Sequence, residues 1–313
     1  MDLQKYKDIH PALLGELCEE YSDLLPSEIP VLHQAPDALS FLRNYVTPSI
    51  PFIVKNGIKH WPAIKKWSKE YLRSKLGDKT CTVAITPDGY ADAVVEDMFM
   101  VAEEKSMTFN QFLDELENPQ LSRVLYLQKQ NNCLMDEYSC LVHDVDFHIP
   151  WATEAFGEFP EASNFWMGDR RAITSLHKDN YENLYCVVKG VKEFILYPPT
   201  ASAWMPYGSF KTGKYHYENS SFKILDICNE VKWITMDPFV KITTNNPLYP
   251  LYSKTKEYVC NVCEGDILYL PALWFHHVRQ SHACVAVNYW YEMNFLKYPY
   301  FCFLEKLGKL ATS

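Results

Sequence analysis

The chain has 313 residues, of which 48% are hydrophobic and 15% aromatic, and its formal net charge at pH 7 is −9. This composition predicts a folded protein with a sizeable core and excludes extended disorder. The acidic balance disfavours binding to a nucleic-acid backbone and is compatible with a basic protein partner. The N-terminus MDLQKYKDIH has no apolar signal-peptide core, and no apolar run is long enough for a bilayer. We therefore expect a protein of the cytoplasm, or also of the nucleus, without membrane or direct nucleic-acid contact.

Residues 1–120 are expected to form a mixed region of helices and short strands that packs on a barrel. Apolar residues recur at helical spacing after His10, and Thr108 and Gln111 have the spacing of a capping box. Ser68 and Gly77 are placed to begin and end a helix. The resulting prediction is helices over 10–25, 36–46, 68–77 and 108–119, with strands in 51–56, 82–94 and 123–130.

The pattern changes after about residue 164 to successive short strands separated by Gly and Pro turns. Such a series predicts a closed antiparallel sandwich or barrel, with strands expected over 164–169, 173–177, 183–188, 192–199, 256–265, 266–280 and 284–293. Residues 200–250, rich in Pro, Asn, Tyr and Ser, are expected to form a long surface insertion. Residues 296–313 predict a C-terminal helix whose aromatic and leucine face needs a partner surface, so a homodimer is one expected arrangement.

The stretch TSLHKDNYENLYCVVKG places His177 and Asp179 two residues apart, on one face of a strand. If Lys189-Gly190 is the loop of a β-hairpin, Asn183 and Lys192 face the same way as that pair, together with Phe and Leu side chains. Polar groups on an apolar inner face are costly unless something satisfies them. A metal ion and an anionic ligand would satisfy all four.

A third metal ligand is available about 100 residues later, in the segment WFHHV. Neighbouring residues of a strand face opposite ways, so one of His276 and His277 should reach the metal, and the pattern by itself does not choose between them. Two histidines and one carboxylate with open coordination positions is the arrangement of non-haem Fe(II) oxygenases. Lys192 would then pair with a cosubstrate carboxylate.

Two other clusters of residues carry potential metal ligands. HDVDFH, residues 143–148, offers His143, Asp146 and His148, but its setting between loop segments favours a solvated loop. Cys260 and Cys263 form one C-x-x-C pair without a second pair, in a segment with strand character, which favours a structural interpretation. The chain has neither a nucleophile-elbow motif nor a phosphate-binding loop.

The segments LHKDNYENLYCVV, LYLPALWFHHV and VAVNYWYEM resemble the jumonji-C oxygenases. The resemblance implies a mainly β, α+β protein with a double-stranded β-helix, that is, a jelly-roll or cupin-like barrel, flanked by N-terminal helices and a C-terminal helix. It places this catalytic core over residues 121–295. It also implies Fe(II), 2-oxoglutarate and dioxygen as cofactors, with His177, Asp179 and His276 as the catalytic metal ligands.

The same resemblance implies that Lys192 holds the distant carboxylate of 2-oxoglutarate. Further cofactor contacts implied by it are Thr174, Tyr126, Asn183 and Asn288. Thr174 has the opposite strand parity to His177, so a bulge or twist is required if it is to reach the pocket.

Within the family, VAITPDGYADAV, VLYLQKQ and NFWMGD resemble a lysyl hydroxylase. The implied reaction is 3-hydroxylation of a lysine in a GTP-binding protein of the developmentally regulated class. Asp88 and Asp92 are candidates for its ammonium, although Asp88 could serve only a turn, and Trp290 is a candidate substrate contact. The alternatives are a lysine demethylase, a metal-dependent endopeptidase acting on histone tails, and a non-catalytic cupin-like binding module.

Overall fold

The structure is a computed structural model that describes residues 3–118, 122–239 and 251–312. Its α-helices are α1 (Leu3–Leu24), α2 (Ala38–Phe41), α3 (Pro62–Lys66), α4 (Lys69–Leu76), α5 (Phe109–Leu116), α6 (Cys133–Asp136), α7 (Pro150–Phe156) and α8 (Tyr298–Thr312). Short 3₁₀ segments cover Ser139–Asp144, Pro199–Ala203, Tyr252–Lys254 and Phe295–Lys297, and a π-helical turn, Leu42–Val46, continues α2. None of the helices in the described ranges is long and apolar enough to cross a membrane.

The predicted capping residues begin their helices as expected. Ser68 Oγ accepts a hydrogen bond from the backbone N–H of Tyr71 at the start of α4. Thr108 and Gln111 make both reciprocal bonds of a capping box at the start of α5. Each bond satisfies an N–H that the first helical turn leaves without an intrahelical acceptor.

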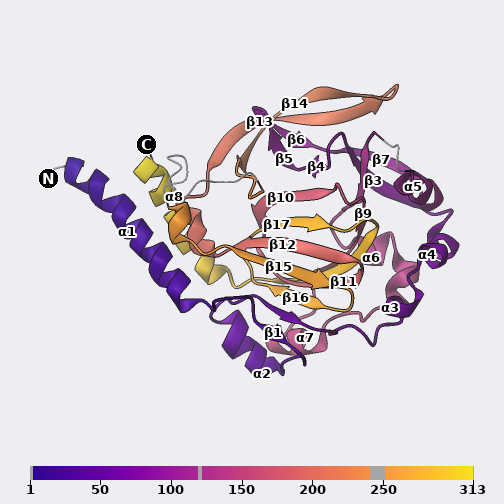
Figure 1. Ribbon diagram of the computed structural model, residues 1–313, viewed down its shortest axis with the longest axis horizontal. Helices are drawn as coiled ribbons and strands as arrows, with labels where there is room; N and C mark the ends of the chain where they lie inside the picture. The colour runs from indigo at the N-terminus through magenta and orange to yellow at the C-terminus, as the bar shows by residue number, and fades with distance from the viewer. Residues whose placement is uncertain (1–2, 119–121, 240–250, 313) are drawn as a thin grey trace.

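Two sheets form the body of the molecule (Figure 1). The larger has the order β1-β2-β16-β11-β18-β9-β8-β3-β7, and the smaller has the order β15-β12-β17-β10-β4. The strands of the larger sheet are β1 (Val31–Leu32), β2 (Phe52–Val54), β3 (Thr80–Thr86), β7 (Glu103–Thr108), β8 (Val124–Leu127), β9 (Ala162–Gly168), β11 (Tyr181–Lys189), β16 (Ile267–Leu270) and β18 (Cys284–Glu292). Those of the smaller are β4 (Tyr90–Ala91), β10 (Ile173–Lys178), β12 (Val191–Tyr197), β15 (Tyr258–Cys263) and β17 (Phe275–Gln280).

The expected β-hairpin at Lys189-Gly190 is wrong. β11 pairs with β16 and β18 in the larger sheet, whereas β12 pairs with β15 and β17 in the smaller one. Gly190, at φ +82°, is therefore the point where the chain crosses between sheets. Strand pairing that spans almost 100 residues overrides the local turn signal.

The prediction of a single strand over 266–280 is wrong as well, because this segment forms two strands, β16 and β17. The backbone between them turns at Pro271–Trp274, where Leu273 has a φ of +68°. The turn carries the chain from one sheet to the other, so His276 enters the smaller sheet beside β10.

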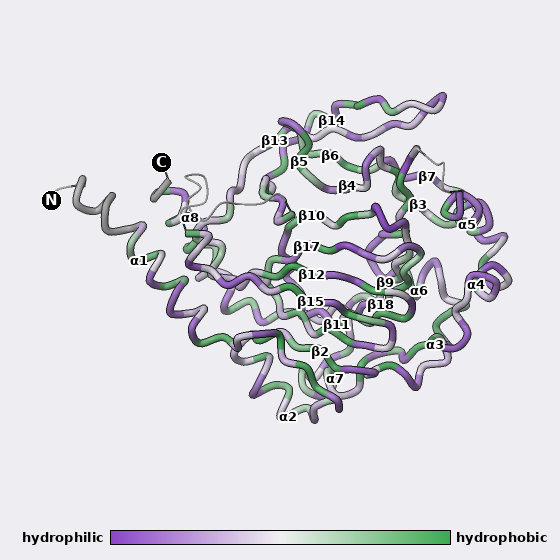
Figure 2. Tube along the Cα trace, viewed as in Figure 1, coloured by the Kyte–Doolittle hydropathy of each residue, from purple (hydrophilic) through white to green (hydrophobic). Residues whose placement is uncertain are grey.

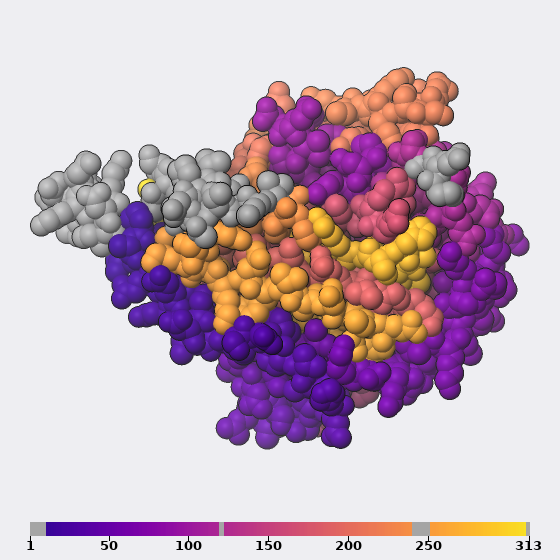
Figure 3. Space-filling model, in the orientation of Figure 1, coloured from indigo at the N-terminus to yellow at the C-terminus, as the bar shows by residue number. Residues whose placement is uncertain are grey.

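Residues 200–250 contain a long two-stranded ribbon. Strands β13 (Tyr207–Glu218) and β14 (Ser221–Ile234) join β6 (Met98–Val101) and β5 (Ala93–Val95) in a third sheet, of order β14-β13-β6-β5. The ribbon lies at the edge of the body, beyond β5 and β6 (Figures 1 and 3). Residues 240–250 of the expected insertion lie outside the described residues.

The three largest groups of packed hydrophobic side chains lie in different parts of the molecule. One fills the space between the two main sheets, with Trp166, Phe194 and Leu268 among its members. A second lies where α2 to α7 cover the outer face of the larger sheet. The third joins α1, α8 and the 3₁₀ segment Pro199–Ala203 to the outer face of the smaller sheet. In Figure 2 hydrophobic and hydrophilic residues both occur along the central strands, and the β13–β14 ribbon likewise carries hydrophilic and hydrophobic stretches.

Candidate active site

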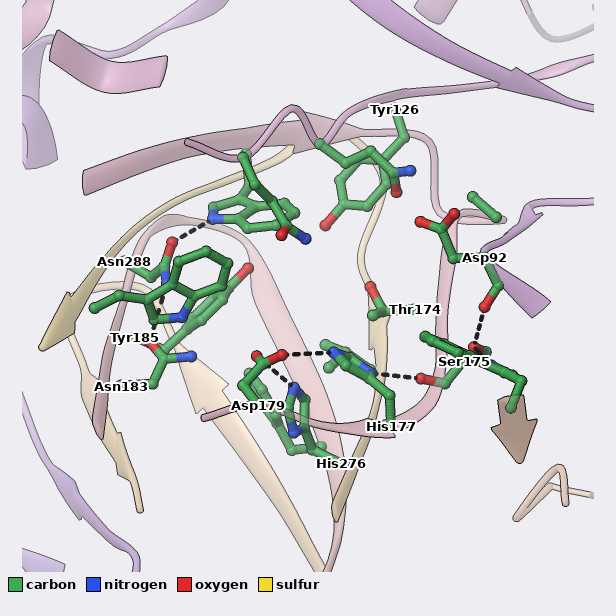
Figure 4. Close-up of a pocket in the computed structure, with 18 of the residues that line it drawn as sticks. Asp92, Tyr126, Thr174, Ser175, His177, Asp179, Asn183, Tyr185, His276 and Asn288 are labelled. Atoms are coloured by element: carbon green, nitrogen blue, oxygen red, sulfur yellow. Dashed lines mark hydrogen bonds and ion pairs between the residues drawn. The ribbon is translucent and has the colours of Figure 1, made fainter. Parts of the chain in front are cut away.

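A cavity of about 290 Å³ opens between the two main sheets, and the ribbon supplies part of its wall. Its lining includes Thr174, His177 and His276 from the smaller sheet and Tyr126, Asn183 and Asn288 from the larger one. Figure 4 shows these side chains pointing into a common space. Residues far apart in the chain thus converge because the jelly-roll crossings place β10 beside β17 and opposite β8, β11 and β18.

His177, Asp179 and His276 form a compact group at one end of this cavity. One potential ligand atom from each residue lies within 4.8 Å of the others. The Nε2 atoms of His177 and His276 are each 3.6 Å from an oxygen of Asp179. In the part of the chain that the structure describes, this is the group of His, Cys, Asp and Glu residues close enough to hold a metal ion.

The two imidazoles are oriented in the same way. His177 Nδ1 lies 2.8 Å from the carbonyl oxygen of Ser175, and His276 Nδ1 lies 3.2 Å from that of Trp274. A donating Nδ1–H in each ring leaves the Nε2 lone pair free and directed toward Asp179. Burial, assisted by the neighbouring His177, lowers the pKa of His276 to about 4, so its ring is neutral at physiological pH. Neutral imidazole and ionised carboxylate fit a divalent transition metal.

Lys192 lies deep in the molecule, with 1% of its surface exposed. Its ammonium donates to the Tyr126 hydroxyl at 2.9 Å and to Gln280 Oε1 at 2.5 Å. Both partners are neutral, and the described residues form no ion pair with Lys192. A buried cation with only neutral partners is suited to an anionic ligand.

Thr174 reaches the cavity through the bulge that its parity required. In the pairing of β10 with β17, Thr174 faces Val278 and His177 faces His276, which leaves one extra residue on β10. The bulge reverses the alternation of side chains, so Thr174 and His177 both line the cavity.

A chain of buried amides crosses the floor of the cavity. Asn288 Nδ2 donates to Asn183 Oδ1 at 3.0 Å, and Asn288 Oδ1 accepts from the Trp166 indole at 2.8 Å and from Asn164 at 3.3 Å. Asn288 has no exposed surface. These bonds fix the amide orientations and join β11, β18 and β9 behind the metal group.

The structure separates the two predicted acidic substrate residues. Asp92 lines the metal cavity at a φ of +54°, and burial raises the pKa of its carboxyl group. Asp88 is exposed, accepts from the Tyr90 N–H at 3.1 Å in its turn, and borders a neighbouring cavity. Trp290 lines the metal cavity, and its ring stacks on Tyr181 with centroids 4.9 Å apart.

Sequence reasoning missed several residues of the cavity. Trp233, at the end of the ribbon, stacks on the His177 ring with 6.1 Å between centroids and 12° between planes. Its indole donates to Ser175 Oγ at 3.1 Å, and Ser175 Oγ donates to the carbonyl of Asp92 at 2.6 Å. Gln280, which is the second partner of Lys192 and does not line the cavity, was also missed. Gln280 could have been found, because the segment WFHHVRQ puts it on the same strand as the histidines. The residues around Trp233 contain no pattern that links it to the site.

His277 and the two competing clusters lie elsewhere. His277 points to the opposite face of β17, where Asp237 is 3.8 Å away. His148 contacts the Thr153 hydroxyl, and Asp146 contacts His60. Cys260 is buried and Cys263 half-buried within β15, in agreement with the structural interpretation.

Comparison with known proteins places this architecture in a family. Residues 38–297 match the family described as "Cupin-like domain". The chain is 45% identical over 306 residues to human "Bifunctional peptidase and (3S)-lysyl hydroxylase JMJD7", covering 96% of this chain and 94% of that protein.

This chain is a jumonji-C member of the cupin-like family. It is also 40% identical to "Lysine-specific demethylase JMJ32" of Arabidopsis thaliana over 92% of this chain and 89% of the relative. With "JmjC domain-containing protein E" of Dictyostelium discoideum the identity is 35%, over 98% and 95% of the two chains. Family membership confirms the expected jumonji-C identity and the cupin-like, mainly β fold with terminal helices.

Proposed function

We propose that the protein is an Fe(II)- and 2-oxoglutarate-dependent lysyl hydroxylase that acts on a protein substrate. The observation that carries the proposal is the meeting of His177, Asp179 and His276 in one cavity with a buried Lys192 beyond them. The 45% identity over 306 residues to a protein named as a (3S)-lysyl hydroxylase supports the reaction type.

The metal would be held by the Nε2 atoms of His177 and His276 and by the carboxylate of Asp179. When bound, iron and 2-oxoglutarate use dioxygen to replace a substrate C–H by C–OH, while the ketoacid becomes succinate and carbon dioxide. The chain's own contribution is to hold the donors. The backbone carbonyls of Ser175 and Trp274 keep both imidazoles in the tautomer that offers Nε2.

Lys192 and Tyr126 would bind the distant carboxylate of 2-oxoglutarate. The Lys192 ammonium and the Tyr126 hydroxyl already contact each other at 2.9 Å, so two donors are held together for one anion. Thr174 lies on the same cavity wall as His177 and adds a hydroxyl. Asn183 and Asn288, which line the same cavity, would add polar contacts to the bound cosubstrate.

The target lysine would enter between Asp92, Trp233 and Trp290. Asp92 offers a carboxylate on the cavity wall and has no ion pair with a described residue, and the aromatic rings offer apolar surface for the methylene stem. A carboxylate accepts hydrogen bonds from the N–H groups of a free ammonium, and each added methyl group removes one of these donors although the charge remains. This favours hydroxylation of unmodified lysine over demethylation, the activity in the name of the Arabidopsis relative.

The first experiment incubates the protein with Fe(II), ascorbate, 2-oxoglutarate and a lysine peptide. We expect succinate and a peptide heavier by one oxygen atom, and we expect His177→Ala to abolish both. Full turnover by His177→Ala would contradict the metal assignment. Peptide cleavage without dioxygen and 2-oxoglutarate would favour the endopeptidase alternative, demethylation of a methylated peptide would favour the demethylase, and failure to bind iron would favour a cupin-like binding module.

Asp92→Asn and Asp88→Asn test the two predicted substrate carboxylates as a matched pair from the two turns that flank β4. Loss of a charge-assisted contact costs about 1.5–3 kcal/mol, so Asp92→Asn should raise the KM for the peptide by roughly tenfold or more and leave 2-oxoglutarate binding intact. Asp88→Asn should behave like the wild type, because its carboxylate lies outside the metal cavity. The reverse ranking would assign the ammonium contact to Asp88.

For the partner, we propose a GTP-binding protein of the developmentally regulated class, in keeping with the resemblance to a lysyl hydroxylase. We further propose a homodimer through α1 and α8, and a location in the cytoplasm, with the nucleus as an alternative. Incubation with the purified GTP-binding protein, followed by peptide mass mapping, identifies the modified lysine if the proposal is right.

A further inference from the structure

The residue between His177 and Asp179 is the last residue of β10 and points away from the cavity. Lys178 lies on the outer face of β10, where its ammonium is 3.2 Å from Ser202 Oγ and 5.0 Å from the centroid of Phe275. Only 15% of its side chain is exposed. Contacts to the Lys178 side chain on the outer face of β10 therefore help to fix the backbone that carries His177 and Asp179.

A single carboxylate on α8 faces that ammonium. Glu305 Oε2 lies 3.8 Å from Lys178 Nζ, and the same carboxylate makes a close ion pair with Lys232. Lys309, one turn further along α8, is 3.7 Å from Glu305. Glu305 and Lys178 are 13% and 15% exposed, so this pair is shielded from water on both sides, whereas Lys232 and Lys309 are each about half exposed.

Lys232 connects the same carboxylate to the other side of the metal group. It immediately precedes Trp233, the residue that stacks on His177 and donates to Ser175. Glu305 therefore contacts the residue between His177 and Asp179 and also the residue beside the aromatic cover of His177. A single residue of α8, outside the cavity, is thus connected both to the segment that carries His177 and Asp179 and to Trp233, which stacks on His177.

α8 packs closely enough on the rest of the protein to fix the position of Glu305. Gly308, one turn after Glu305, packs so closely on the 3₁₀ segment Pro199–Ala203 that a Cβ there would overlap the carbonyl group of Ala203. Only glycine permits this approach. The distance between Glu305 and the strand of the metal ligands is therefore fixed by the packing of the helix.

We infer that Glu305 is a positioning residue of the active site, which holds the His177–Asp179 segment through Lys178 and the Trp233 cover through Lys232. The inference rests on the proposed function for the identity of the metal ligands. Its consequence is that α8 contributes to metal affinity although no residue of α8 lines the cavity.

The test measures Co²⁺ binding by the full-length protein from its visible absorption, with no substrate present. Glu305→Gln should weaken Co²⁺ binding by roughly tenfold, the range found for residues that support metal ligands. Quenching of indole fluorescence by bound Co²⁺ should also diminish, because Trp233 would lose its fixed place against His177. Lys306→Gln, on the exposed side of the same helix, is the matched control and should bind like the wild type.

Two further variants separate positioning from general loss of stability. Lys178→Gln breaks one of the two connections and should weaken Co²⁺ binding by no more than Glu305→Gln does, and the double variant should be no worse than Glu305→Gln alone. Gly308→Ala should have the same effect without altering a charge. Wild-type Co²⁺ affinity in folded Glu305→Gln, or additive losses in the double variant, would overturn the inference. Because Co²⁺ binding needs no turnover, an absence of lysine hydroxylation by the wild type would count against the proposed function alone.

Discussion

Both predicted histidine ligands donate through Nδ1 to the backbone carbonyl two residues earlier, Ser175 for His177 and Trp274 for His276. The backbone of each strand thus orients its own imidazole. This orientation depends only on residues next to each histidine in the sequence. Lys192 differs, because its partners Tyr126 and Gln280 come from other strands. Its residue type could be recognised in the sequence, and its surroundings could not.

Lys192→Met should weaken 2-oxoglutarate binding while leaving the metal group in place. Removing one partner of a buried charged contact costs about 2–5 kcal/mol, so the Kd for 2-oxoglutarate with Mn²⁺ present should rise by roughly two orders of magnitude. Calorimetric titration measures it. Lys189→Met, at the half-buried start of the same crossing, is the control, because its ammonium contacts the Ile64 carbonyl and Glu264 and does not contact Tyr126 or Gln280. Unchanged affinity in Lys192→Met would remove Lys192 from the cosubstrate site.

Glu182 predicts a pH dependence of stability. Burial raises the pKa of its carboxyl group in the folded state, although the Tyr269 hydroxyl donates to it at 2.7 Å and the Ala272 N–H at 3.2 Å. The folded state therefore retains this proton to higher pH than the unfolded chain, so the free energy of unfolding should fall as pH rises from the ordinary value of 4.5 through the raised pKa.

Glu182→Gln keeps an oxygen acceptor for both donors and carries no charge to desolvate. We expect the free energy of unfolding of this variant not to show the decrease with rising pH that Glu182 causes. Above the raised pKa the variant should therefore be more stable than the wild type. Urea denaturation at several pH values measures both proteins. Parallel stability curves for the two would contradict the expectation.

At the scale of elements, helix ends and strand positions followed from local chemistry, and strand partners did not. Capping residues at Ser68 and Thr108 act within a few residues of themselves, so their sequence patterns suffice. The Lys189-Gly190 turn was misjudged because a tight turn is compatible both with a hairpin and with a crossing between sheets. Distant strands β16 and β17 decide between these alternatives by pairing with β11 and β12.

Gly190→Ala tests the crossing. At φ +82° a Cβ is strained, and it would also overlap Ser281 Oγ, which accepts from the Val191 N–H at 2.9 Å. We expect a loss of about 1–3 kcal/mol in the free energy of unfolding. Gly157→Ala is the control, since it has a φ of +74° with no atom within 4 Å of the added carbon. Equal losses in the two variants would show that the contact with Ser281 adds nothing.

At the scale of the whole molecule, α1 and α8 present an uncovered apolar face. Leu13, Leu17, Tyr300 and Phe303 border a shallow apolar cavity between the two helices, and each is at least 41% exposed. An uncovered face of this kind indicates an interaction surface. α8 carries both this apolar face and Glu305. A partner bound to the apolar face would therefore contact the same helix that supports the active site.

We expect the wild-type protein to sediment as a dimer at micromolar concentration. Phe303→Glu should yield monomers, because a charge at a residue 61% exposed in the monomer would be buried in the dimer. Thermal unfolding of the isolated variant should change little. A wild-type protein that remains monomeric at every concentration examined would contradict the proposed dimer.

The sequence by itself determined the ligand types, the helix caps and the mainly β character, because these depend on residue chemistry and on strand periodicity. The need for a bulge at Thr174 followed once the family resemblance implied that this residue reaches the pocket. Only the tertiary structure decided which strands pair and that Gly190 is a crossing. It also brought Trp233, Gln280 and Glu305 into the neighbourhood of the site. These features depend on contacts between segments tens to hundreds of residues apart, whose partners are chosen by the packing of the whole core and leave no local pattern.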